Sequence, residues 1–161
     1  MSATGNRHQA LLVQSNNRAE VCEIMNIIKQ TPEMILENWD FFADAIESTA
    51  RKIGESYTPL QFYEVIDSGE ATAFNVYEAD ELRGLLVLTE HNDRYTANAV
   101  LHVDLLFLTG PSLIHEMTDT LNMIAEEASF DQIEFRSPRK GWFKYLDAAG
   151  FKSSSTFYKE L

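Results

Sequence analysis

The chain has 161 residues, of which 45% are hydrophobic and 11% aromatic, a composition that excludes an intrinsically disordered chain. This length is enough for one domain with a buried core, and we predict a single domain over residues 1–161. The net charge of −12 disfavours nonspecific binding to nucleic acid, and no apolar run reaches the length of a membrane span, so neither partner is expected.

The N-terminal region predicts a short strand and a helix. Ala10–Gln14 is an apolar strand candidate, and Asn17 can cap the helix that follows. The single cysteine, Cys22, excludes an intrachain disulfide bond and is predicted to be a small core residue, and Met1–Gln9 lacks the apolar region of a signal peptide. We therefore expect a reducing, cytoplasmic setting. The residues that recur at helical spacing are Val21, Ile24, Met25 and Ile28.

A second helix begins with a strong start signal. Thr31 can cap it, Pro32 suits its first turn, and Gly54 is a natural stop. Apolar residues then follow three and four positions apart, which favours packing against the core but also fits a seam between subunits. These residues are Leu36, Trp39, Ala43, Ile46, Ala50 and Ile53.

The middle of the chain predicts a short helix and three antiparallel strands. Thr58 precedes a proline and starts a helix over Pro59 to Asp67. The stretches Ala71–Tyr77 and Arg83–Glu90 read as a hairpin. The polar stretch His91–Ala97 reads as a loop, and Val100–Leu108 as the third strand of the meander.

The C-terminal third predicts a long helix, a strand, a short helix and a last strand. The apolar face of the long helix consists of Met117, Leu121, Ile124 and Ala128. Gln132–Arg136, Gly141–Ala149 and Phe151–Lys159 follow as strand, helix and strand. The fold class is α/β (α+β mixed sheet), with N-terminal helices, then an antiparallel β-meander, then β-α-β-α-β.

This order resembles the GCN5-related N-acetyltransferase (GNAT) superfamily from end to end. Ser68-Gly69-Glu70 followed by Leu85–Thr89 matches the family's pattern of two strands around a turn, and Gly150-Phe151 matches the Gly-Phe before the final strand. The resemblance implies a GNAT fold and, for an active member, transfer of an acetyl group from acetyl-CoA to an amine.

A more specific resemblance is to the small GNAT-like proteins encoded near head and portal genes of tailed bacteriophages. It covers about residues 58–161 and depends on L-T-E at Leu88–Glu90, on the short T-G-P-S connection and on R-x-G-W at Arg139, Gly141 and Trp142. It implies a virion structural or assembly component in the virion or host cytoplasm. Its partners would be other phage structural proteins or further copies of itself.

The connection before the long helix departs from the family's pyrophosphate loop, Q/R-x-x-G-x-G/A. Only Gly110 remains, and Pro111 has no N–H group to offer a phosphate. Ser112 and Leu113 could still present two donors at the helix start, so Gly110, Ser112 and Leu113 are the candidate cofactor-binding residues. The sequence predicts no cofactor for an inactive protein, and acetyl-CoA for an active one.

The candidate catalytic residues are His102, Asp104 and Tyr145. The family often places a proton-donating tyrosine four residues before the Gly of Gly-Phe, a position that Leu146 holds here, with Tyr145 adjacent. His102 and Asp104 lie two apart on a strand, so both face one side. Either could accept a proton from an amine, or the two could form the polar face of a half-exposed strand. No spacing suggests a metal site.

The last 26 residues form a basic end on an acidic chain. Residues 1–135 carry 7 basic and 23 acidic residues, whereas residues 136–161 carry 6 basic and 2 acidic. Arg139, Lys140, Trp142 and Lys144 are candidates for protein binding, because aromatic and basic side chains alternate there. The alternative is a helix whose Trp142 packs in the core while its lysines face solvent.

Two functions therefore compete, with a third beside them. The first is a degenerate GNAT-fold phage protein that is non-catalytic and acts through protein–protein contacts. The alternative is an active acetyl-CoA-dependent N-acyltransferase with an altered pyrophosphate loop. The net charge also fits a small acidic regulator of a host protein, which the charge count cannot separate from the first.

Overall fold

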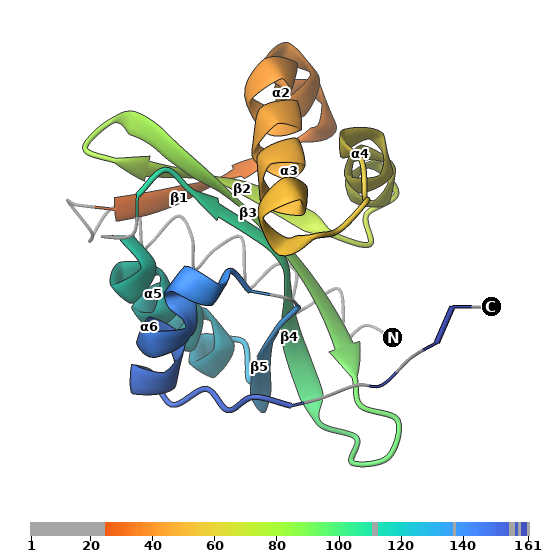
Figure 1. Ribbon diagram of the computed structural model, residues 1–161, viewed down its shortest axis with the longest axis vertical. Helices are drawn as coiled ribbons and strands as arrows, with labels where there is room; N and C mark the ends of the chain where they lie inside the picture. The colour runs from red at the N-terminus through yellow and green to blue at the C-terminus, as the bar shows by residue number, and fades with distance from the viewer. Residues whose placement is uncertain (1–24, 111–112, 137, 155–156, 158, 161) are drawn as a thin grey trace.

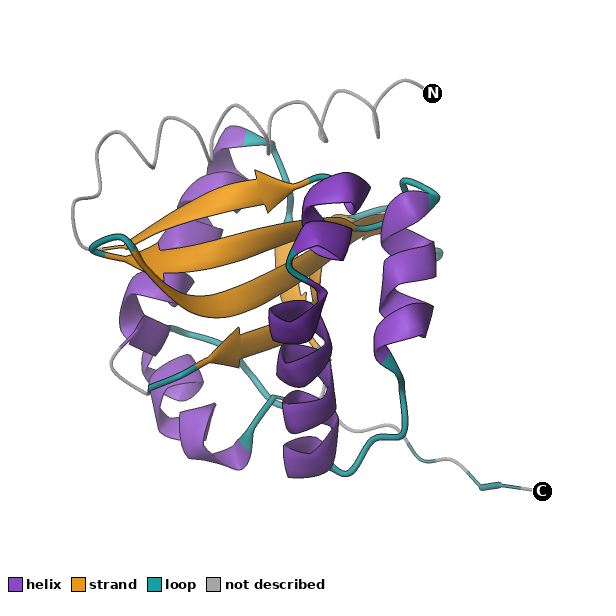
Figure 2. Cartoon of the chain, turned by 90° about the horizontal axis from the view of Figure 1, so that it is seen from above, coloured by secondary structure: helices purple, strands orange, loops and turns teal. Residues whose placement is uncertain are grey.

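The computed structural model describes residues 25–110, 113–136, 138–154, 157, 159 and 160, and these form one mixed sheet covered by helices on both faces (Figures 1 and 2). Five strands lie in the order β1-β2-β3-β4-β5. The first four pair antiparallel, and β5 runs parallel to β4. The α/β mixed-sheet prediction is confirmed for this part of the chain. The predicted strand Ala10–Gln14 and Cys22 lie outside it.

The first described element is a strand where the sequence predicted a helix. β1 (Met25–Gln30) pairs with β2 from Met25↔Glu78 to Gln30↔Ala73. Met25 and Ile27 are buried and Ile28 is half-buried on the other face, so side chains alternate between the two faces with the period of two that is typical of a strand. The helical assignment of Met25 and Ile28 is wrong because pairing with a distant strand overrides local spacing.

The next helices begin where their capping signals place them. The Thr31 hydroxyl accepts a hydrogen bond from the Met34 N–H group at 3.2 Å and starts α2 (Pro32–Glu37). The helix is interrupted at Asn38, so the single predicted helix is two, and α3 (Trp39–Ile53) ends at Gly54 in the left-handed region. Thr58 caps α4 (Pro59–Asp67), whose bounds are those predicted.

The interruption at Asn38 also turns the buried face of this region. Leu36, predicted in the apolar stripe, is 55% exposed, and Trp39 is half-buried. Ile46 and Ala50 are buried as predicted. The buried residues of α3 are Phe42, Ala45, Ile46, Thr49 and Ala50.

The meander follows the predicted order with longer strands. β2 (Thr72–Glu78) and β3 (Glu81–Asn92) meet at a two-residue turn, Ala79-Asp80, where both residues have positive φ. β4 (Ala99–Leu108) completes the meander. Since β3 continues to Asn92 and pairs with β4 to that point, His91 belongs to a strand and the loop predicted from His91 begins two residues later.

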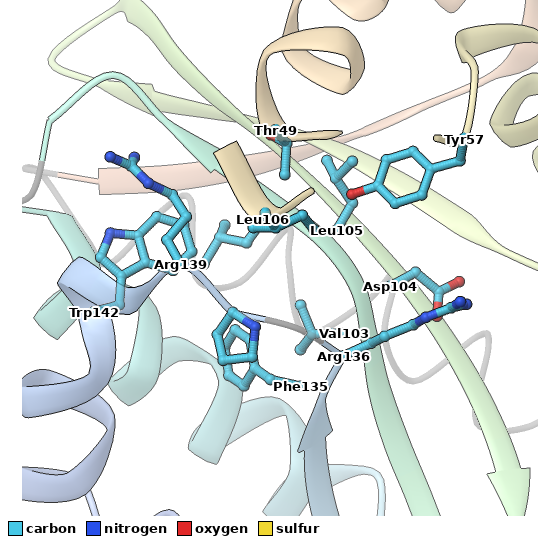
Figure 3. A pocket seen from close by; sticks show the side chains of 12 residues that line it. Thr49, Tyr57, Val103, Asp104, Leu105, Leu106, Phe135, Arg136, Arg139 and Trp142 are labelled. Carbon is cyan, nitrogen blue, oxygen red and sulfur yellow. The ribbon is translucent and has the colours of Figure 1, made fainter. Parts of the chain in front are cut away.

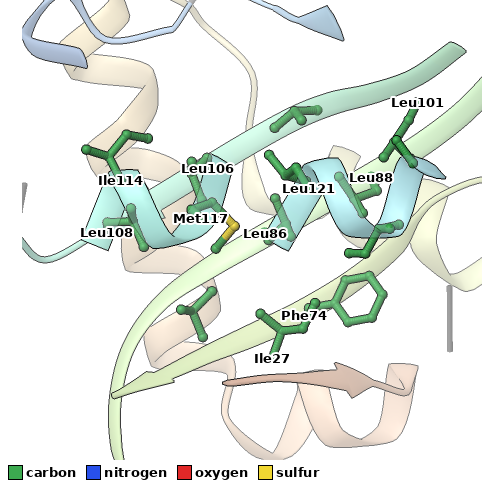
Figure 4. Close-up of a cluster of buried hydrophobic side chains, with 14 of the residues drawn as sticks. Ile27, Phe74, Leu86, Leu88, Leu101, Leu106, Leu108, Ile114, Met117 and Leu121 are labelled. Atoms are coloured by element: carbon green, nitrogen blue, oxygen red, sulfur yellow. The ribbon is translucent and has the colours of Figure 1, made fainter. Parts of the chain in front are cut away.

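The sheet separates two hydrophobic cores. One lies between the sheet and α5 (Ile114–Glu127), with Met117 and Leu121 against Phe74, Leu86 and Leu101 (Figure 4). The other lies between the opposite face and helices α2 to α4. Its fully or nearly fully buried residues are Ile35, Phe42, Ala45, Ile46, Ile66, Ala71, Ala73, Leu85, Val87 and Leu105. No helix in the described ranges is long and apolar enough to cross a membrane.

The C-terminal end contains one departure from prediction. β5 (Gln132–Phe135), a 3-10 turn η2 (Lys140–Trp142) and α6 (Phe143–Ala148) occupy the predicted places. Residues 151–154, expected to begin the last strand, form none. The Phe151 N–H group donates instead to the Leu146 carbonyl at 3.0 Å, and its ring packs on Phe135. The Phe151–Lys159 strand is therefore wrong over 151–154.

Candidate functional site

A β-bulge in the middle of β4 shapes the site. Leu105 pairs with Val87 and Val103 pairs with Leu88, so Asp104 is an extra residue that has no paired residue on β3. Such an insertion bends a strand and increases its twist. β4 pairs with β5 only as far as Val103↔Phe135, although it continues to Leu108. Within the described residues, the outer edge of β4 beyond the bulge has no paired strand.

A narrow pocket that opens to solvent lies where β4 and β5 part (Figure 3), and its cavity volume of about 10 Å³ has room for roughly one water molecule. β4 forms one wall and the segment that follows β5 forms another. The remaining wall comes from Thr49 and Ile53 of α3 and from Tyr57 in the connection between α3 and α4. The lining residues are Thr49, Ile53, Tyr57, Val103, Asp104, Leu105, Leu106, Phe135, Arg136, Pro138, Arg139 and Trp142.

His102 lies between two carboxylates beside this pocket. Its Nδ1 atom is 2.6 Å from Glu134 Oε1 on β5, and its Nε2 atom is 3.2 Å from Asp104 Oδ1. The prediction that His102 and Asp104 face one side of the strand is confirmed. An imidazole can donate to both carboxylates only when it is protonated, so the arrangement can hold a proton between three groups. In the described ranges, no group of three His, Cys, Asp or Glu residues could hold a metal ion.

Asp104 is a stronger proton acceptor than an ordinary carboxylate. Burial raises its pKa above 3.8, and this effect outweighs four opposing ones, the smallest of them the charge of His91. The Thr89 hydroxyl donates to Asp104 Oδ1 at 3.0 Å, and the charges of His102 and Arg136 also favour the ionised form. A carboxylate that is half-buried at a pocket and more basic than usual can take a proton from an ammonium group.

Tyr57 is a site residue that the sequence reasoning missed. Its hydroxyl oxygen is buried and has no hydrogen-bond partner in the described part of the chain. Burial and the charge of Glu55 raise the pKa of Tyr57 to about 12, although Arg136 acts in the opposite sense. The sequence offered one indication of a site role for Tyr57: it lies directly before the helix start at Thr58-Pro59, which fixes the position of its backbone.

The other predicted catalytic residue, Tyr145, is not at the pocket. It is half-buried on α6, packs against the core under α5, and has the Lys144 ammonium 5.0 Å above its ring. Leu146, which holds the family's tyrosine position, is buried in the same core. The structure therefore joins His102 and Asp104 but leaves Tyr145 apart from them.

The candidate cofactor-binding residues lie where β4 leads into α5. Leu113 precedes the first residue of α5 and its side chain is buried in the core, so only its backbone could face a ligand. A side chain at Gly110 would meet open space, and its φ is not positive. Neither crowding nor conformation therefore requires glycine there. Ser112 lies outside the described residues.

The candidate protein-binding residues divide into two groups. Trp142 is only 3% exposed, because its ring closes one end of the pocket and joins the core under α5. Its ring is therefore not presented on a surface, contrary to the docking prediction. Arg139 lies over this ring at 5.3 Å and is half-buried, whereas Lys140 and Lys144 are exposed. Binding of a protein by the three basic residues stays a prediction.

The mixed five-stranded sheet with helices on both faces matches the fold of GNAT acetyltransferases of known structure. A ribosomal-protein-alanine N-acetyltransferase from Brucella melitensis biovar Abortus 2308 is 17% identical, with a TM-score of 0.64 over 86% of this chain and 99% of that one. A predicted acetyltransferase from Clostridium acetobutylicum, solved with acetyl-CoA, is 12% identical over 86% and 96%, with a TM-score of 0.63. A GNAT family acetyltransferase from Staphylococcus aureus subsp. aureus USA300_TCH1516 is 8% identical over 86% and 99%, with a TM-score of 0.62.

At these identities the likeness establishes the fold. No protein-family model matches the sequence, and no curated protein matches it either.

Proposed function

We propose that the protein is an acyl-CoA-dependent N-acyltransferase, which moves an acyl group from a thioester to an amine. The observation that carries this proposal is the position of Asp104, a half-buried carboxylate with a raised pKa, at the point where β4 loses its pairing with β5. The likeness to acetyltransferases, one of them solved with acetyl-CoA, supports the same conclusion.

The open edge of β4 fits the coenzyme. Residues Leu105 to Leu108 pair with β3 on one side only, so their outer edge can accept an extended chain by adding it as a strand. The pantetheine arm of coenzyme A contains two amide groups that suit such pairing. The positive end of α5, which begins at Ile114, would favour its phosphates.

The polar groups beside the pocket fit the other half of the reaction. Acetyl-CoA, when bound, supplies the acyl group as a thioester. An ammonium group must lose a proton to become a nucleophilic amine, and Asp104 would accept that proton directly or through a water molecule. His102 holds Asp104 on one side and Glu134 on the other, which positions the carboxylate and spreads the proton's charge.

The experiment is a calorimetric titration of acetyl-CoA into the protein at low salt. We expect saturable binding with a Kd below about 100 μM, or roughly −5.5 kcal/mol. Asp104→Asn serves as a control that should bind equally, because binding uses the strand edge and not the carboxylate. No binding at millimolar acetyl-CoA would exclude the proposed function.

A second candidate is a non-catalytic GNAT-fold component of a tailed phage, in the virion or host cytoplasm. Leu146 stands where the resembled family often has its tyrosine, and a single glycine remains in the loop before α5. The segment Arg139 to Trp142, which carries the phage resemblance, fills one end of the pocket. This candidate expects co-purification with phage structural proteins and no response to acetyl-CoA.

A further inference from the structure

The Tyr57 hydroxyl is a buried donor without an acceptor. Buried polar groups in proteins are almost always hydrogen-bonded, because an unmade bond costs free energy that water would otherwise offset. Thr49, the other hydroxyl among the residues that line the pocket, already donates to the Ala45 carbonyl at 2.8 Å. Among the lining hydroxyls, the one on Tyr57 is therefore left for a ligand.

The Tyr57 ring is held firmly in this place. It packs edge-on against Phe62, with ring centroids 5.0 Å apart and planes at 69°. The next residue, Thr58, caps α4 and receives a hydrogen bond from Gln61 N–H at 3.3 Å, while its own N–H group donates to Gln61 Oε1 at 2.8 Å. A donor on such a support is positioned before any ligand arrives.

The hydroxyl points from the α3–α4 connection toward the middle of the pocket, where Leu105 and Leu106 of β4 form the facing wall (Figure 3). These two residues belong to the open edge that would hold the pantetheine arm. A thioester at the end of that arm would therefore lie between the β4 edge and Tyr57.

We propose that Tyr57 Oη donates a hydrogen bond to the thioester carbonyl oxygen of bound acyl-CoA. This inference rests on the proposed function and assigns a catalytic donor within that site. The donor has to remain protonated at neutral pH, and the raised pKa of Tyr57, about 12, is consistent with that requirement.

The amine nitrogen forms a bond to the carbonyl carbon, and the C=O π electrons move to the oxygen, which becomes an oxyanion held by Tyr57 O–H. The amine enters this step neutral, after Asp104 has passed the proton of the ammonium group to solvent. The second N–H proton, lost as the new bond forms, goes to Asp104, which then returns it to solvent. The oxyanion then re-forms the C=O bond as the C–S bond breaks, and coenzyme A leaves as a thiolate that takes up a proton from solvent. Tyr57 is unchanged at the end.

The test compares two ligands in binding, so it needs no acceptor amine. Acetyl-CoA and S-ethyl-CoA, a thioether that lacks the carbonyl oxygen, are titrated into wild type, Tyr57→Phe and Tyr63→Phe. We expect Tyr57→Phe to weaken acetyl-CoA about two- to tenfold and to leave S-ethyl-CoA unchanged, which is the loss of one neutral hydrogen bond. Tyr63, which is half-buried and does not line the pocket, should affect neither ligand.

The possible outcomes separate this inference from the proposed function. If wild type binds both ligands and Tyr57→Phe weakens neither, or weakens both equally, the inference is wrong and the proposed function stands. If wild type binds neither ligand, both are overturned. Thermal unfolding checks the fold, since Tyr57→Phe removes an unpaired hydroxyl and should keep or raise the melting temperature.

Discussion

Asp104 combines a structural role with a chemical one. As the inserted residue of the β4 bulge it separates β4 from β5, and as a carboxylate it contacts His102 and Thr89. The first role needs only a residue at this position, whereas the second needs an ionisable oxygen pair. A substitution that keeps the size of the side chain therefore separates the two roles.

We expect Asp104→Asn to lower the rate of acyl transfer about 10²- to 10⁴-fold while acetyl-CoA binds as before, because an amide cannot accept the amine proton. Thiol release with a panel of primary amines measures the rate. In wild type the rate should fall at acid pH, as a pKa raised above 3.8 is crossed and the carboxylate becomes protonated. This acid limb should be missing from the residual activity of the variant.

Asp119→Asn is the matched control for this prediction. Asp119 also contacts a histidine, His115, at 3.7 Å, but both side chains are exposed on α5. Its substitution should leave the rate and the pH profile unchanged. A wild-type rate in Asp104→Asn would mean that another group takes the proton.

At the scale of elements, the close approach of β3 and β4 depends on one glycine. A Cβ atom at Gly84 would collide with the Phe107 carbonyl oxygen and lie 2.8 Å from Leu108 Cδ2. β3 pairs with β2 on one side and β4 on the other, so neither neighbour can move without disturbing the middle of the sheet. Gly84 also follows Arg83, which is the extra residue of a β-bulge in β3.

We expect Gly84→Ala to lower the free energy of unfolding by about 3 kcal/mol, as for a methyl group forced into a full site. Denaturant unfolding monitored by circular dichroism measures it. Gly141→Ala is the control, since a side chain there meets open space and φ is not positive. It should change stability by less than about 0.5 kcal/mol. Equal losses for the two variants would contradict the steric argument.

The elements that the sequence predicted well are those whose signals are local. α4 has a capping threonine and a proline at its start, and its bounds were predicted to the residue. β1 was predicted as a helix because Met25 and Ile28 also fit a helical period, and what makes it a strand is its pairing with β2, some 50 positions away. The break between α2 and α3 at Asn38 could not be predicted, because no proline or glycine stands there to indicate the end of a helix.

The site was predictable in the same partial way. His102 and Asp104 were found because a strand puts residues two apart on one face. Glu134 contacts His102 from β5, 32 positions away, and Tyr57 lines the same pocket as Asp104 from the α3–α4 connection, so no spacing rule could find them. The bulge that parts β4 from β5 follows from the register of β3 against β4, which local sequence does not encode.

At the scale of the whole molecule, the charge is divided between an acidic body and a basic end. The net charge of −12 opposes the approach of a polyanion such as coenzyme A. Residues 136–161 reverse this locally with 6 basic and 2 acidic residues, and Arg136 and Arg139 line the pocket. The protein would thus bind an anionic ligand through a local field of opposite sign to its overall charge.

We expect acetyl-CoA binding to weaken several-fold between 50 and 500 mM NaCl, because salt screens the attraction between its phosphates and the basic end. S-acetylpantetheine, which has the same arm and thioester but no phosphate, should change less than about twofold. Calorimetry on both ligands measures the difference. Parallel changes would mean that the basic end takes no part in binding the coenzyme.

The bulge at Asp104 also sets a parity rule for β4. Before it, odd-numbered residues such as Leu101 and Val103 face the α5 core; after it, even-numbered residues such as Leu106 and Leu108 do. Deleting this single residue would join Val103 directly to Leu105 and give one parity along the whole strand, while every later residue kept its layer. Leu105 would still pair with Val87 and face the α3 side. The bulge therefore leaves both cores as a regular strand would build them, and what it adds is the carboxylate of Asp104 at the place where β4 parts from β5.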